Sequence, residues 1–263
     1  AKHMLQRTAL EYAKLKSNSH IVCLFPIAHT RIADVMNIIR KYSNVFYHST
    51  VSLNPIGQVS LMKEIYFIEG WANEYGIKRK SDQCFAGQSK VTFILIDADN
   101  LETVKEMKTK IRELFNVGNH SVHISDYHSD AIRIAKTVFN DNSIHFLNNR
   151  KYISFPKYKQ LIDSIKPDDN NVITGSSVLS LYGLRDCKDL DLIYYNNPPA
   201  DSHNQYLETH YKLTLDDIVN NPLYHLYYQG FKYASLNVIK NMKIIRNEPK
   251  DVVDVQLIKK VEG

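Results

Sequence analysis

Short apolar segments alternate with helical ones along the first half of the chain, and this alternation limits the possible folds more than any other feature. Strand-like runs cover residues 20–26, 44–53, 91–97 and 120–124. Between and after them, apolar side chains recur every three to four residues, which is typical of amphipathic helices. Strands separated by helices at this spacing predict an α/β or α+β fold in which the helices pack on a sheet.

The chain of 263 residues is long enough for two domains of ordinary size. Its helical periodicity ends in the polar stretch 141–157, so we place a domain boundary near residue 150. Another polar stretch, 76–90, is predicted to be a loop. The sequence ends without a clear stop, so we expect it to be part of a larger multidomain chain. The predicted organisation is residues 1–19 as a tag remnant and leading helix, 20–150 as an N-terminal domain and 151–263 as a C-terminal domain.

The composition bears on the cellular location of the protein and on the charge of its ligands. No run of 18 apolar residues is present, which predicts that no segment spans a membrane, and no signal-peptide pattern opens the chain. The three cysteines lack the spacing of a metal site or of a disulfide scaffold, which predicts a reducing, cytoplasmic location. The net charge of +5 is compatible with phosphate-bearing ligands but does not by itself indicate nucleic-acid binding.

The strongest chemical signal is a Gly-Ser turn followed by an Asp-x-Asp. A predicted strand, 172–174, runs into Gly175-Ser176, and a return strand is expected to carry Asp189 and Asp191 on one face because side chains alternate along a strand. Two carboxylates held close together favour a bound cation, and oxygen ligands with open positions suit Mg²⁺ or Mn²⁺ bridging to phosphates. The glycine lets the backbone approach a phosphate, to which Ser176 can donate a hydrogen bond.

Two segments in the second half resemble one known family. Residues 172–193 look like the signature of the DNA-polymerase-beta-like nucleotidyltransferases, closest to the abortive-infection (AbiEii-type) branch. Residues 231–258 are similar to the closing helices of that family. The matching positions are Gly175, Ser176, Gly183, Arg185, Asp189 and Asp191 in the first segment, and Lys243, Arg246, Lys250, Asp251 and Asp254 in the second.

This resemblance implies a mixed-sheet, nucleotidyltransferase-like domain and a set of site residues. Asp189 and Asp191 would hold the metal, and the donor nucleotide would contact Gly175, Ser176, Ser177, Arg185 and Lys243. The family usually adds a third carboxylate that activates the attacking hydroxyl. Here Glu208 is the weak choice for that role, with His203 and His225 as alternative bases and Asp254 as a helix cap or an ion-pair partner of Arg246 or Lys250.

The first half resembles the nucleoside diphosphate kinases. Residues 119–131 are similar to the Asn-x-x-His-Gly-Ser-Asp signature of that family, with His123 at the phosphorylated position, and the element order over 20–140 implies a ferredoxin-like domain. The departures are large, because Phe25 replaces the expected Lys and the nucleotide-facing loop is nearly absent. We therefore expect the fold without the kinase activity, and His123 as an acceptor-site or interface residue or a core histidine.

Three functions remain open from the sequence. The first is a metal-dependent nucleotidyltransferase that uses a nucleoside triphosphate. The second is a glycosyltransferase in glycan assembly, because an Asp-x-Asp metal site also holds the diphosphate of a nucleotide sugar. The third is a non-catalytic nucleotide-binding module. The sequence does not identify the acceptor, which could be a glycan, a small molecule or RNA.

Overall fold

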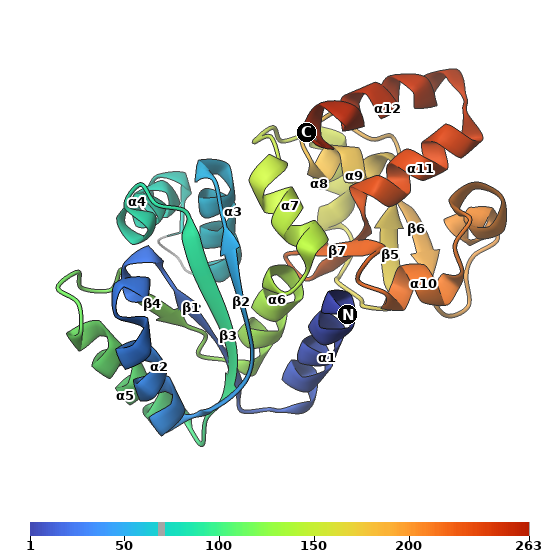
Figure 1. The fold of residues 1–263 in the computed structure, drawn as a ribbon. Helices are drawn as coiled ribbons and strands as arrows, with labels where there is room; N and C mark the ends of the chain where they lie inside the picture. The colour runs from blue at the N-terminus through green and yellow to red at the C-terminus, as the bar shows by residue number, and fades with distance from the viewer. Residues whose placement is uncertain (68–71, 263) are drawn as a thin grey trace. The chain divides into compact units, whose positions relative to one another are not determined.

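The computed structural model describes residues 1–67 and 72–262 and has an α+β fold with two small, mainly antiparallel sheets (Figure 1). The chain divides into two compact units. One contains Leu5–Phe139, and the other contains residues 140–262 together with Ala1–Met4. The break falls between Phe139 and Asn140, about ten residues before the boundary placed from composition. The helix α1, Lys2–Leu15, includes the residues interpreted as a tag remnant.

The N-terminal unit is built on a four-stranded antiparallel sheet in the order β2-β3-β1-β4. Helices connect β1 to β2 and β3 to β4, so both the order and the connections are those of the ferredoxin-like fold. An additional helical pair, α3 and α4, lies between β2 and β3. The strands are β1 Ser19–Leu24, β2 Asn44–Ser52, β3 Lys90–Asp97 and β4 Val122–Ile124, and the helices are η1 Pro26–Arg31, α2 Ile32–Tyr42, α3 Pro55–Ile65, α4 Glu74–Phe85, α5 Leu101–Glu113 and α6 His128–Val138.

Alternate residues of the central strands are buried on the two faces of this sheet. On one face Val22 and Ile94 pack with side chains of α2 and α5, such as Ile39 and Met107. On the other face the ring of Phe25 meets the ring of Phe85 of α4 at 5.6 Å. Helices therefore cover the sheet on both sides, which explains why β1 reads as a continuous apolar run rather than an alternating one.

The stretch 76–90 is not the loop that its polarity predicts, because most of it lies in α4. The Asn73 side chain caps this helix by accepting a hydrogen bond from the Gly76 N–H at 2.8 Å. Ile77, Ser81 and Cys84 are buried at spacings of four and three residues, while most of the charged side chains between them face solvent. A narrow stripe of buried side chains is enough to form this helix, although the segment as a whole is polar.

The C-terminal unit contains a second, mixed sheet in the order β6-β5-β8-β7. Its central pair, β5 and β8, is parallel, and both outer pairs are antiparallel. The mixed sheet agrees with the fold class predicted for this half. The strands are β5 Asn171–Thr174, β6 Asp191–Tyr194, β7 His225–Tyr228 and β8 Phe231–Ala234.

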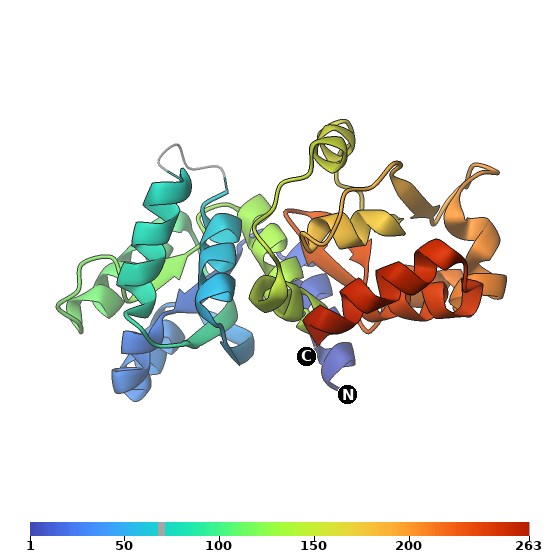
Figure 2. The same cartoon turned by 90° about the horizontal axis from the view of Figure 1, so that it is seen from above.

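Helices surround this sheet, and α12 folds back along α11 (Figure 2). The polar stretch after residue 140, where helical periodicity seemed to end, begins with a helix, α7, which buries Phe146 and Leu147 and is capped by Asn140. The remaining elements are α8 Pro156–Asp163, α9 Ser176–Leu181, η2 His203–Tyr206, the π-type turn η3 Leu207–Tyr211, α10 Leu215–Asn220, α11 Leu236–Arg246 and α12 Pro249–Glu262, with α7 spanning Asp141–Asn149.

All three cysteines are buried with free thiols, as expected for residues that serve as small core side chains. Within the described ranges, no helix combines the length and the apolar character needed to cross a membrane.

Candidate functional site

The candidate site begins at the turn that connects β5 to α9. Gly175 has φ of +68°, a region that strongly favours glycine, and a Cβ placed there would lie 2.6 Å from Oδ2 of Asp191. The glycine is therefore required for two reasons, its backbone conformation and its close approach to the return strand. Ser176 opens α9 next to this turn. Ser177 is buried instead, and its hydroxyl donates to the Asp189 carbonyl at 3.3 Å.

The return strand places the two aspartates differently from the prediction. β6 begins at Asp191, which pairs with Thr174, whereas Asp189 lies in the bend before the strand and is exposed. The prediction that both residues lie within one strand was therefore wrong. Both aspartates nevertheless line the same cavity.

This cavity has a volume of about 420 Å³ and lies wholly within the C-terminal unit. It gathers side chains that are up to 79 positions apart in the sequence, from the Gly-Ser turn, β6, η2, α11 and α12. Its lining consists of Gly175, Ser176, Arg185, Lys188, Asp189, Asp191, His203, Met242, Lys243, Arg246, Lys250, Val253 and Asp254.

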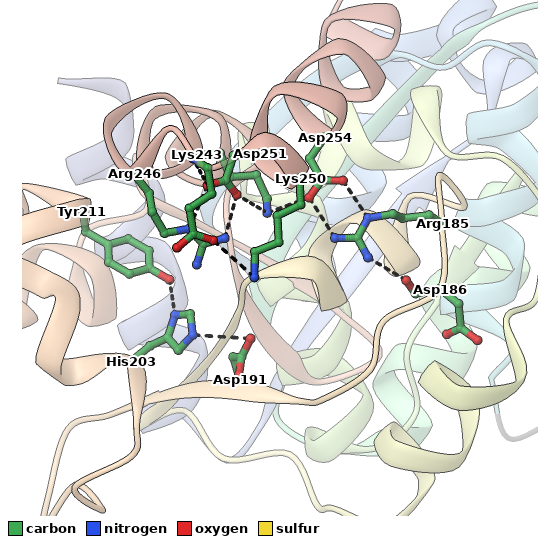
Figure 3. A network of polar contacts seen from close by, with 11 residues as sticks. Arg185, Asp186, Asp191, His203, Tyr211, Lys243, Arg246, Lys250, Asp251 and Asp254 are labelled. Atoms are coloured by element: carbon green, nitrogen blue, oxygen red, sulfur yellow. Dashed lines mark hydrogen bonds and ion pairs between the residues drawn. The ribbon is translucent and has the colours of Figure 1, made fainter.

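A network of ion pairs forms one wall of the cavity (Figure 3). Arg185 donates to both carboxylate oxygens of Asp254, from Nε at 2.7 Å and from Nη2 at 2.8 Å. Arg246 binds Asp251 in the same two-pronged way, at 2.9 and 2.6 Å. Lys243 lies between the two pairs, 2.8 Å from Asp254 and 3.4 Å from Asp251, and its side chain is only 2% exposed.

The network holds both carboxylates in their charged form. Burial alone would raise the pKa of Asp251, but the hydrogen bonds from Arg246 and the Glu248 N–H, with the charges of Arg246 and Lys243, lower it to about 2. Burial also acts on Asp254, and its pKa is lowered by Arg185 and Lys243. Asp254 thus pairs with Arg185 and Lys243 rather than with the predicted Arg246 or Lys250.

The lining carries more positive than negative charge. Five cationic side chains and three carboxylates line the cavity, and two further carboxylates, Asp251 and Glu248, pair with cations of this wall from outside the lining. The cations come from two separate parts of the chain. A cavity wall that carries several cationic side chains attracts anionic ligands such as phosphate groups. The cationic residues are Arg185, Lys188, Lys243, Arg246 and Lys250.

On the opposite side, a histidine touches the key carboxylate. His203 Nε2 lies 3.4 Å from Asp191 Oδ2, and its Nδ1 lies 2.8 Å from the Tyr211 hydroxyl. Burial would raise the pKa of Asp191, but the contact with His203 and the charges of His203, Arg246 and Lys243 outweigh it and lower the pKa. Tyr211, which contacts His203, was not identified from the sequence. It lies at the end of the π-type turn η3, and turns of this kind are frequent at functional sites.

Several predicted site residues lie elsewhere. Glu208, the weak choice for a third carboxylate, is exposed on η3 and does not line the cavity. His225 is buried on β7, where Nδ1 lies 2.9 Å from the Ile218 carbonyl, an arrangement typical of a core histidine.

His123 belongs to the N-terminal unit, on β4, and its ring meets the ring of Tyr66 at 4.9 Å. Burial, followed by the charges of Lys108, Lys80 and Arg112, lowers the pKa of His123 to about 3. It is therefore a neutral, largely buried histidine among cations.

The donor set of the cavity suits a small hard cation shared with a ligand rather than a closed protein site. Asp189 and Asp191 offer carboxylate oxygens, the ligands that Mg²⁺ and Mn²⁺ prefer. Among the residues that the structure describes, no cluster of three or more His, Cys, Asp or Glu side chains is arranged to hold a metal ion. Any metal here would take its remaining ligands from water and from the bound molecule.

No known family model matches the chain, and no curated protein is similar to it in sequence. Among solved structures, a nucleoside diphosphate kinase of Aquifex aeolicus is similar over 43% of this chain and 89% of that one, with 14% sequence identity and a TM-score of 0.31.

Proposed function

We propose that the protein is a metal-dependent transferase that uses a nucleotide donor, with nucleotidyl transfer from a nucleoside triphosphate to a hydroxyl or phosphate acceptor as the leading reaction. The observation that carries this proposal is the placement of Asp189 and Asp191 beside a Gly-Ser turn in a cavity that five cationic side chains also line. Carboxylates, a close backbone approach and cations together match the needs of a polyphosphate with its divalent ion.

Each group has a definite task in this proposal. Asp189 and Asp191 would hold Mg²⁺ or Mn²⁺, and a bound ion of this kind neutralises phosphate charge. Ser176 would donate to a donor phosphate, and Lys243, fixed by Asp251 and Asp254, would place its charge without reorganising. In the transfer, the acceptor oxygen bonds to the α-phosphorus, the bond from the α-phosphorus to the bridging oxygen breaks, and pyrophosphate and a proton leave.

One observation favours the second candidate, a glycosyltransferase that uses a nucleotide sugar. Nucleotidyl transfer usually uses a third carboxylate to accept the proton of the attacking hydroxyl. The carboxylates that line the cavity are Asp189, Asp191 and Asp254, and Asp254 is already bound by Arg185 and Lys243. A glycosyl transfer in which the metal grips the diphosphate leaving group is compatible with this set.

Product analysis separates these reactions. The protein is incubated with Mn²⁺ or Mg²⁺ and either labelled nucleoside triphosphates or nucleotide sugars, and the released phosphates are separated. Pyrophosphate release supports nucleotidyl transfer, and nucleoside diphosphate release supports glycosyl transfer. Binding without turnover supports a non-catalytic module.

The release should disappear in Asp191→Asn and persist in Asp201→Asn, a matched change at an exposed carboxylate outside the cavity. Equal loss in both variants, or no binding of any nucleotide, would contradict the proposal.

A further inference from the structure

Asp189, one of the two proposed metal ligands, lies in the irregular segment 185–190 between α9 and β6. Asp191 differs, because it begins β6 and pairs with Thr174. In an irregular segment the hydrogen bonds of a helix or a sheet do not fix the backbone, so other contacts must do so. The contacts of segment 185–190 therefore decide where the Asp189 carboxylate lies in the cavity.

Two serines of α9 bind the backbone of this segment. The Ser180 hydroxyl donates to the Arg185 carbonyl at 2.8 Å, and the Ser177 hydroxyl donates to the Asp189 carbonyl at 3.3 Å. Both serines are buried, so water competes little with these bonds. Arg185 also donates from Nη1 to the Asp186 carbonyl at 2.9 Å. Side chains therefore bind three carbonyl groups of the segment.

The side chain of Asp186 binds the same segment to a second helix, α8. Its Oδ1 accepts hydrogen bonds from the N–H groups of Cys187 and Tyr158, both at 2.9 Å. Its Oδ2 accepts a hydrogen bond from the Lys157 N–H at 3.1 Å. Lys157 and Tyr158 lie in the first turn of α8, and the side chain of its N-cap residue, Phe155, makes no capping bond. Asp186 therefore caps a helix that lies earlier in the chain.

The helix that Asp186 caps is itself anchored to the sheet. The hydroxyl of Tyr158 in α8 lies 2.6 Å from the hydroxyl of Tyr233 in β8, one of the two central strands. Two neighbouring N–H groups of α8 fix the Asp186 carboxylate in distance and in orientation, because each of its oxygens meets a donor of set direction. The segment that carries Asp189 is therefore held by both α9 and α8.

We propose that Asp186 is a positioning residue, whose bonds to the first turn of α8 fix segment 185–190 and thereby set the place of the Asp189 carboxylate in the cavity. Asp186 does not line the cavity, and its carboxylate points away from the ion-pair network (Figure 3). It therefore acts through the backbone and not by contacting a ligand. This inference rests on the proposed function, since it concerns a ligand of the proposed metal. It also gives α8, which lies outside both segments of the family resemblance, a part in the site.

The bonds of Asp186 are tested first in the metal-free protein, by amide hydrogen exchange and nitrogen-15 NMR. The amides of Lys157, Tyr158 and Cys187 should be protected from exchange in the wild type. Asp186→Ala should remove the protection of all three and shift the amide resonance of Asp189. A wild type in which these amides exchange freely, or a variant in which the Asp189 resonance does not move, would overturn the proposal.

The consequence for the metal is tested by titration calorimetry with Mn²⁺. We expect Asp186→Ala to bind Mn²⁺ at least about tenfold more weakly than the wild type, as is typical when a residue that orients a metal ligand is lost. Asp186→Asn keeps Oδ1 but turns an amide donor toward the Lys157 N–H, so it should lose less. Asp217→Ala is the matched control and should bind normally, because Asp217 belongs to the capping box of α10 in the same unit and does not line the cavity.

The two proposals fail in distinguishable ways. Wild-type affinity for Mn²⁺ in Asp186→Ala overturns the positioning role alone. If circular dichroism shows that the alanine variant does not fold, Asp186→Asn takes its place, and wild-type affinity in that variant overturns the positioning role. A wild type whose three amides are protected but which does not bind Mn²⁺ overturns the metal of the proposed function, and the positioning role with it.

Discussion

His123 in the N-terminal unit and His203 in the C-terminal unit are both largely buried histidines, yet their charged neighbours differ: His123 lies among cations, and His203 lies beside a carboxylate. His123 lies among Lys80, Lys108 and Arg112, and its pKa is lowered to about 3 by burial and by these cations. His203 lies against the carboxylate of Asp191 and lines a cavity. Burial therefore does not decide what a histidine does, and the charge of its neighbours does.

The two units also differ in how their cations are neutralised. Near His123, Lys80 and Arg112 each have a lowered pKa. The largest cause is burial, which disfavours the charged form of both side chains. In the cavity, Arg185 and Arg246 have raised pKa values because they bind Asp254 and Asp251. The paired cations therefore have a fixed geometry and a stabilised charge, whereas burial penalises the charge of Lys80 and Arg112.

The largest expected effect concerns the aspartates that distinguish the C-terminal cavity. Asp189→Asn and Asp191→Asn should each reduce turnover at least about 100-fold, because each removes a charged ligand of the proposed metal. Turnover is measured as phosphate release, and folding by circular dichroism. The unfolding temperature should hold in Asp189→Asn. It should fall in Asp191→Asn, because His203, Arg246 and Lys243 stabilise the ionised carboxylate in the folded protein. Activity that survives both changes would place the active site elsewhere.

The second prediction concerns pH. A histidine whose pKa falls from 6.5 to about 3 on folding contributes its full stability above pH 6.5, and that stability decreases as the pH falls toward 3. The slope is about 1.4 kcal/mol per pH unit from this one group. In urea unfolding between pH 7 and 4, the slope of the wild type should exceed that of His123→Gln by this amount. His48→Gln, an exposed histidine in the same unit, is the control and should keep it.

The same neighbours make His123 a poor phosphate carrier. After incubation with a nucleoside triphosphate, mass spectrometry under alkaline conditions should find no phosphohistidine that depends on His123. A stoichiometric phosphoprotein lost in His123→Ala would remove the contrast between the two histidines and place the chemistry in the N-terminal unit.

The third prediction concerns a substitution that removes the ion pairs of Lys243 in the cavity wall. Lys243→Met removes a buried ammonium shared by Asp251 and Asp254, and we expect it to lower the free energy of unfolding by about 3 kcal/mol. Lys250→Met makes the same change where the side chain is 66% exposed, and should cost less than about 0.5 kcal/mol. Urea titrations at neutral pH measure both values, and equal losses would mean that the buried network does not matter for stability.

The smallest effect is expected when acid protonates Asp251 in the same network. Because the pKa of Asp251 falls from 3.8 to about 2 on folding, its contribution is complete above pH 4 and is lost as the pH drops to 2. This contribution is of order 1–2 kcal/mol. Unfolding curves at pH 5 and pH 2.5 should show it in the wild type and not in Asp251→Asn, which should be the less stable protein at pH 5.

Local sequence patterns were sufficient for much of the fold. The run before Pro26, the apolar face of α5 and the Gly-Ser turn before α9 each depend on neighbours within one element, so their periodicity can be read directly. The helix α4 was missed for the same reason. Its buried stripe, which includes Ile77 and Cys84, is narrow within a charged stretch, and only packing against α3 and η1 reveals it.

By itself, the sequence determined the alternation of strands and helices in the N-terminal half and the pairing of Gly175 with the Asp-x-Asp, because these features repeat or lie close together along the chain. Only the tertiary structure decided that Lys243 binds Asp254 rather than facing solvent, that Glu208 lies outside the cavity, and that Tyr211 orients His203. Those contacts join residues from different elements, and their energies depend on burial and distance, which no spacing along the chain specifies.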